Sequence, residues 1–210
     1  LYNLKPKVIF KHGYSKLDYL LNRINERIKS NEEPYVLFAP GWNGSNSPVE
    51  NGNAEKYIGK IINQGYKLYF KPHPESLKRS LKEINGIINK YTNEEKFIFF
   101  DDTLTIDIIL NAKYLITDWS GISIEYAFVT GNYVLYIDSP QKTVNKNAHK
   151  LDIEAFESSI RDKIGYIWDK EKKISDYENK KDIEKIMRDN IFNICNSDKL
   201  AADYISKLVI

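Results

Sequence analysis

The stretch Lys71-Pro72-His73-Pro74 has side chains suited to phosphate chemistry. Its two prolines restrict the backbone on either side of the histidine. An imidazole titrates near neutral pH, so His73 is suited to donate to a phosphate oxygen or to protonate a leaving phosphate. The alternative is a surface histidine between two prolines that end a strand. Two features favour a functional His73: the lysine at position 71 and the Asp118–Ser120 turn, which is expected on a neighbouring strand and also has groups that bind phosphate.

The turn from Asp118 to Ser123 offers the groups that bind a phosphate. Ser120, Gly121 and Ser123 supply hydroxyls and a close backbone approach at the start of an apolar helical segment. Free N–H groups at a helix start, and the positive end of the helix dipole, favour an anion there. Ser120 is the expected N-cap; ordinary capping, which needs only one serine, is the alternative.

Other polar residues have both a structural and a functional interpretation. Asp118 either holds the turn by accepting backbone N–H groups or orients His73, and Trp119 is expected to pack rather than to stack on a base. Asp101 and Thr103 follow another strand-like segment. We expect them to cap a short helix, with binding of a ribose hydroxyl as the alternative.

Gly41, Trp42 and Asn43 open a polar, glycine-rich loop that runs to Asn53. Glycine permits close approach to a ligand, and asparagine offers both a donor and an acceptor. A loop of this length after a strand is usually functional. The alternative is a flexible surface loop without a ligand.

The sequence lacks the common metal and cofactor motifs. Its histidines are dispersed at 12, 73 and 149, with no HxxxH or CxxC spacing, so we expect no metal site. Neither GxGxxG nor GxxxxGK[ST] occurs, which argues against hydride transfer and P-loop chemistry. We therefore expect no cofactor.

Strand-like and helix-like segments alternate along the chain. The expected strands are 7–10, 35–39, 66–70, 97–100, 114–116, 133–136 and 164–168. The expected helices are 17–28, 54–62, 77–91, 106–112, 122–129 and 153–160, followed by two closing helices within about 176–210. This alternation predicts an α/β fold, a Rossmann-like three-layer parallel sheet with helices on both faces. The polar loops after successive strands should then meet at one edge.

The bulk composition predicts one compact domain spanning 1–210. The hydrophobic content of 42% allows a substantial core, and the formal charge of +2 without long single-sign blocks argues against a nucleic-acid partner. No apolar run approaches the ~20 residues needed to cross a bilayer, and the start has no signal-peptide pattern, which favours the cytosol. The lone Cys195 is expected in the core. The start at Leu1, without Met, suggests a piece of a longer protein.

Read together, four motifs resemble the CDP-glycerol glycerophosphotransferase family, whose members are similar to teichoic acid polymerases. They are Ala39-Pro-Gly-Trp-Asn43, Lys71-Pro-His-Pro74, Asp101 to Asp107, and Leu115-Ile-Thr-Asp-Trp-Ser-Gly-Ile-Ser-Ile-Glu-Tyr126. The segment His12-Gly-Tyr-Ser-Lys-Leu-Asp18 is similar to one found where the family's second domain begins. The family usually has Thr-x-Arg in place of Gly41-Trp-Asn43, so this chain lacks one cationic phosphate contact.

The resemblance implies the C-terminal, donor-binding half of a GT-B transferase. An acceptor hydroxyl would attack the β-phosphorus of a cytidine diphosphate donor such as CDP-glycerol and release CMP. His73 would stabilise charge on the transferred group, with Ser120, Gly121 and Ser123 holding the diphosphate. From their own residue types and positions, eight further residues are expected to complete the substrate site: Lys71, Gly41, Trp42, Asn43, Asp101, Thr103, Asp118 and Trp119. The acceptor, a cell-surface polymer or lipid-linked group, would meet an N-terminal domain that precedes Leu1 and carries the general base. The protein would lie at the inner face of the cell membrane, and this piece would be inactive alone.

Two other functions remain open. One is a GT-B glycosyltransferase that uses a CMP- or UDP-sugar for capsule or lipid-linked glycan synthesis. The other is a non-catalytic nucleotide-binding or scaffold module, favoured by the absent arginine in the loop at 41–43.

Overall fold

The computed structural model describes residues 8–26, 33–101, 106–142, 147, 150 and 154–208. Its centre is a six-stranded, fully parallel sheet in the order β3-β2-β1-β4-β5-β6. The strands are β1 (Tyr35–Phe38), β2 (Lys67–Phe70), β3 (Phe97–Phe99), β4 (Tyr114–Thr117), β5 (Val134–Tyr136) and β6 (Gly165–Ile167). This order confirms the predicted Rossmann-like sheet. The strand order reverses between β1 and β4, which is where such sheets bind ligands.

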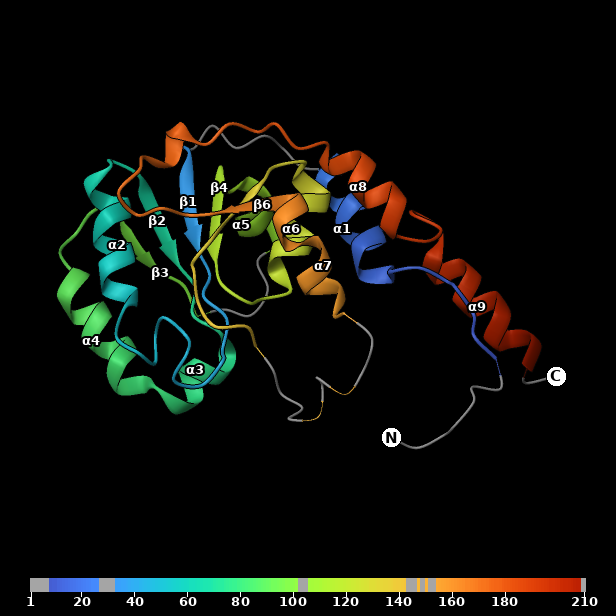
Figure 1. Cartoon of the computed structure of the whole chain (residues 1–210), viewed down its shortest axis with the longest axis horizontal. Coiled ribbons are helices and arrows are strands. Elements are labelled where there is room, and N and C mark those ends of the chain that lie inside the picture. Colours follow the sequence, from blue (N-terminus) through green and yellow to red (C-terminus); the bar gives the residue numbers. More distant parts are fainter. Residues whose placement is uncertain are drawn as a thin grey trace.

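Helices cover both faces of the sheet (Figure 1). One face packs against α1 (Ser15–Glu26), α5 (Ile106–Asn111), α6 (Ile122–Thr130), α7 (Phe156–Ile164) and α8 (Ile183–Asn190). The other packs against α2 (Ala54–Asn63) and α4 (Leu81–Tyr91). The alternation along β1 explains the two layers, because Tyr35 and Leu37 point into the first core while Val36 and Phe38 point into the second.

The unit β4, α6 and β5 lies in the middle of the fold, as the sequence predicts. α6 is buried on nearly all sides, which agrees with its almost uninterrupted apolar sequence. It ends at Gly131, whose φ of 70° and N–H bond to the Ala127 carbonyl form a left-handed C-cap. Among the described residues, no helix is long and apolar enough to span a bilayer.

Three predictions about local structure are wrong. Residues 8–10 form no strand; Val8 and Ile9 are mostly exposed, since no neighbouring strand pairs with them. The single helix expected over 77–91 is two, α3 (Pro74–Arg79) and α4, which meet at Ser80, where the buried side chain donates to Glu50. Cys195 is exposed in the link between helices rather than in the core, with a φ of 64°.

The segment His12–Asp18 ties the first helix to the last, α9 (Ser197–Leu208). Gly13 has a φ of +114°, and a Cβ there would lie 2.4 Å from the Phe192 carbonyl oxygen, so only glycine fits. The buried Asp18 carboxylate accepts from the N–H of Cys195 at 2.6 Å and of Ser197 at 2.8 Å, and from the Ser197 hydroxyl. The motif therefore has a structural function at the α1–α9 contact.

Candidate functional site

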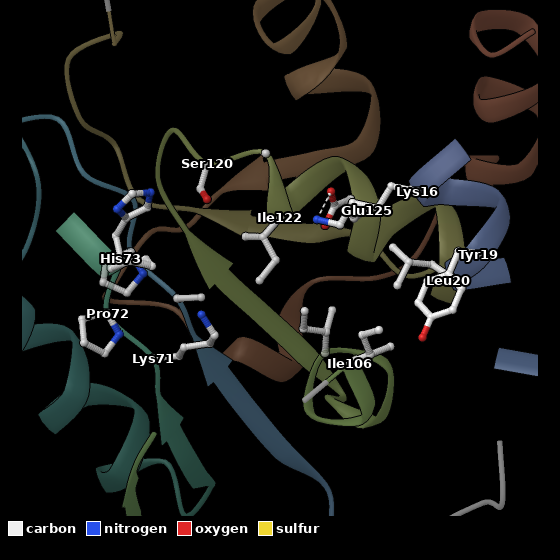
Figure 2. A pocket seen from close by; sticks show the side chains of 15 residues that line it. Lys16, Tyr19, Leu20, Lys71, Pro72, His73, Ile106, Ser120, Ile122 and Glu125 are labelled. Carbon is white, nitrogen blue, oxygen red and sulfur yellow. Dashed lines mark ion pairs between the residues drawn. The ribbon is translucent and has the colours of Figure 1, made fainter. Parts of the chain in front are cut away.

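A cavity of about 450 Å³ opens at the carboxyl ends of β1, β2 and β4, next to the point where the strand order reverses. Its lining residues come from α1, α5, α6 and the loops after these strands (Figure 2). His73, Lys71 and Ser120 lie at one end, and Lys16, Tyr19 and Glu125 lie at the other. The cavity thus joins the two motifs that the sequence analysis singled out.

His73 is the N-cap of α3, directly after β2. Its backbone is extended, and its Nδ1 accepts the N–H of Glu75 at 3.0 Å. A neutral imidazole with Nδ1 as acceptor carries its proton on Nε2. The ring therefore keeps an N–H donor on the side away from the helix.

Burial lowers the pKa of His73 from its ordinary value of 6.5, and the positive charge of Lys142 lowers it further. The folded protein therefore binds fewer protons at this ring than the unfolded chain just below pH 6.5. We expect the stability contributed by the Nδ1 cap to be present above that pH and lost as the pH falls through the lowered pKa.

An NMR titration of the His73 ring should give a midpoint below pH 6.5. A midpoint above pH 6.5 would contradict the capped, neutral ring.

The turn between β4 and α6 is held by backbone and carboxylate contacts. The Asp118 side chain is 1% exposed and accepts the Gly41 N–H at 2.5 Å, so it holds the turn, while His73 is oriented by its own helix. Burial raises the pKa of Asp118. The helix begins at Ile122, as predicted, so its N-cap is Gly121 and not Ser120, and no side chain caps it.

The Ser123 hydroxyl donates to the Ser120 carbonyl at 2.8 Å, so it stabilises the turn and lines no part of the cavity. Ser120 and Gly121 do line it. In the first turn of α6, the N–H groups of Ser123 and Ile124 donate to the carbonyls of Ser120 and Gly121 at 3.1 and 3.2 Å. The helix-start N–H groups that face an incoming anion are therefore those that precede them, at Gly121 and Ile122. An anion at this end of the cavity would meet them.

The loop at 41–43 supports the turn from behind. A Cβ on Gly41 would lie 2.7 Å from the Trp119 carbonyl oxygen and 3.0 Å from Asp118 Oδ1, so glycine is required there. Trp42 lies near the Arg79 guanidinium, and Asn43 donates to the Pro140 carbonyl at 3.2 Å. These contacts anchor the loop to the residues that follow β2 and β5.

Of the residues proposed from the sequence, Lys71, His73, Ser120 and Gly121 line the cavity. Seven others are not among its lining residues: Gly41, Trp42, Asn43, Asp101, Asp118, Trp119 and Ser123. Asp101 is exposed after β3, and Thr103 lies outside the described residues. In the part of the chain that the structure describes, no three acidic, histidine or cysteine side chains gather to hold a metal ion.

Sequence reasoning missed Glu125 and its partners at the other end of the cavity. Glu125 is 8% exposed and accepts from Lys16 Nζ at 2.7 Å and from the Tyr14 hydroxyl at 2.7 Å. Burial and this hydrogen bond raise the pKa of Tyr14. The available signal was a single carboxylate within the otherwise apolar segment of α6. A buried, partnered carboxylate in a cavity is suited to accept from ligand hydroxyls.

Comparisons with known proteins agree with the sequence motifs. The family model described as CDP-Glycerol:Poly(glycerophosphate) glycerophosphotransferase matches residues 1–130. No curated protein sequence matches the chain.

Two solved structures of UDP-GlcNAc 2-epimerase from Methanocaldococcus jannaschii are similar. The one in complex with UDP-GlcNAc and UDP has a TM-score of 0.54 and 18% identity, covering 88% of this chain and 55% of that chain. The second has a TM-score of 0.47 and 17% identity, covering 86% and 55%. The chain thus spans about 55% of their length. The first likeness confirms the predicted fold, a Rossmann-like half of a GT-B structure.

Proposed function

Because the chain belongs to the CDP-glycerol:poly(glycerophosphate) glycerophosphotransferase family, we propose that it binds the nucleotide donor of a glycerol phosphate transfer. The cavity that joins His73 to Ser120 and Gly121 is the observation that carries this proposal. A cytidine diphosphate donor would place its phosphates between the imidazole and the start of α6.

The residues at this end supply positioning and charge stabilisation, which are the main requirements of phosphoryl transfer. The acceptor hydroxyl attacks the β-phosphorus, a new phosphate ester forms, and the bond to the α-phosphate oxygen breaks to release CMP. The Nε2–H of His73 donates to the transferred group, and Lys71 adds positive charge. Backbone N–H groups at Ser120 and Gly121 hold the diphosphate.

The other end of the cavity would bind hydroxyl groups of the donor. Glu125 is fixed there by Lys16 and Tyr14, so its carboxylate is already oriented when a ligand enters. The acceptor, a cell-surface polymer or lipid-linked group, and the general base would be presented by other parts of the protein at the inner membrane face.

Calorimetric and thermal-shift titrations of the protein test the donor class. We expect CDP-glycerol, CDP and CMP to bind and to raise the melting temperature. A clear preference for a uridine nucleotide would favour a glycosyltransferase instead. No stabilisation by any cytidine nucleotide at millimolar concentration contradicts the proposal.

Gly121→Ala should separate ligand binding from folding. Gly121 has helical backbone angles, and the nearest atom to an added Cβ is 3.9 Å away, so stability should change by less than about 1 kcal/mol. The added methyl would crowd the backbone that a bound phosphate must approach at the helix start, and it should raise the Kd of CDP by about tenfold.

The matched control for that variant is Gly86→Ala in α4, where a Cβ meets nothing within 4 Å. It should stabilise the helix by about 0.5–1 kcal/mol and leave CDP binding unchanged. If wild type and Gly121→Ala have the same Kd for CDP, the phosphates do not bind at the start of α6.

A further inference from the structure

Arg161 of α7 lies directly beneath the turn that leads from β4 to α6. One guanidinium nitrogen, Nη1, donates to the Asp118 carbonyl at 2.6 Å, and Nη2 donates to the Ile137 carbonyl at 3.1 Å. Its Cζ lies 4.3 Å from the centre of the Trp119 ring and 3.8 Å from that of Tyr136. The guanidinium therefore contacts the ends of both β4 and β5.

This arrangement uses features that only arginine has. A planar guanidinium stacks on aromatic rings while its fork of N–H groups bonds two acceptors in its own plane. The two carbonyls belong to the residues that directly follow the neighbouring strands β4 and β5, and these strand ends are already joined by the bond from the Ile137 N–H to the Thr117 carbonyl at 2.7 Å. Arg161 thus connects α7 to the strand end from which Ser120 projects.

The same contacts extend to the loop after β5. The Trp119 indole, stacked on Arg161, donates to the Ser139 carbonyl at 3.0 Å, and the next carbonyl, that of Pro140, accepts from Asn43. On the other side, Asp118 accepts from Gly41. Arg161 thus contacts both residues immediately before Ser120, because it donates to the Asp118 carbonyl and stacks on the Trp119 ring.

We propose that Arg161 is a positioning residue, which fixes the Asp118–Trp119 backbone so that Ser120 and Gly121 present their N–H groups to a diphosphate. The inference rests on the proposed function and assigns a role to α7, which lies outside the family match at 1–130. Without the guanidinium, two strand-end carbonyls lose their donors and the turn can relax away from the cavity.

The test compares Arg161→Met, Arg161→Lys and the control Lys163→Met, an exposed residue of the same helix. We expect Arg161→Met to raise the Kd of CDP by about tenfold and to change the Kd of cytidine by less than about twofold, because only the phosphates meet the turn. Arg161→Lys keeps the charge but not the fork, so it should recover only part of the affinity. Lys163→Met should bind CDP and cytidine with the same Kd values as the wild type.

Hydrogen exchange of the peptide 117–123, measured without nucleotide, supplies a second readout. It should be faster in Arg161→Met than in wild type and unchanged in Lys163→Met. A wild type that binds no CDP contradicts the proposed function, and this inference falls with it. If the wild type binds CDP, and Arg161→Met has the same Kd for CDP and the same rate of hydrogen exchange at 117–123, only this inference is overturned and the proposed function stands. Equal weakening of CDP and cytidine would show a general structural role and would also overturn it.

Discussion

Under the proposed function, protein carrying His73→Ala is expected to transfer glycerol phosphate at least about 100-fold more slowly than the same protein with His73. The substitution removes the Nε2–H donor of a ring that lines the cavity, which we propose stabilises charge on the transferred group. It also removes the Nδ1 acceptor that caps α3, which should cost about 1 kcal/mol of stability. Initial rates with CDP-glycerol at saturating acceptor measure the first effect, and urea unfolding measures the second.

His73→Asn is the matched control for that variant. Asparagine is a strong N-cap, so its side-chain oxygen should replace Nδ1 as acceptor for the Glu75 N–H and restore stability. It does not titrate and is too short to occupy the position of Nε2. We expect stability near wild type with activity as low as in His73→Ala. Recovery of activity in His73→Asn would show that His73 acts only as a helix cap.

Asp18→Ala should lower the free energy of unfolding by about 3 kcal/mol, because it leaves buried donors without an acceptor. Asp18 is 4% exposed and accepts from the N–H groups of Cys195 and Ser197 and from the Ser197 hydroxyl. These bonds fix the start of α9 to α1. Urea unfolding measures the loss, and hydrogen exchange of α9 should show that this helix is released first.

Asp198→Ala provides the comparison for Asp18→Ala, since Asp198 lies in the first turn of α9 but is exposed. Its removal should cost less than about 1 kcal/mol. If the two variants lose similar stability, the segment His12–Asp18 does not have the structural function described here.

The arrangement of strands was predictable because each β-rich run is short, apolar and followed by glycine, proline or a polar turn. Tyr114–Thr117 shows this clearly: its side chains are nearly all buried, and the helix that follows ends at a glycine in the left-handed conformation. The meeting of His73 with Ser120 followed from the parallel order of β2, β1 and β4. The roles of these residues in transfer stay predictions.

The errors have a common physical cause, which is that local patterns do not contain long-range contacts. The apolar spacing of the sequence continues across Ser80, so it does not show the break there, where the side chain bonds the distant Glu50. Cys195 follows apolar residues that favour a helix, but its backbone is held by Asp18, far away in the sequence. The partners of Glu125 and Arg161 are also distant, so neither residue stood out as part of the site.

The most direct test of the central claim is an NMR titration of the isotope-labelled protein with CDP, which follows backbone amides and histidine ring nitrogens together. We predict that the largest shifts occur at the amides of Ser120, Gly121 and Ile122 and at Nε2 of His73, with one common Kd. Shifts confined to other parts of the chain, or movement of the amides at 120–122 without any response of His73, would contradict a diphosphate held between the imidazole and the start of α6.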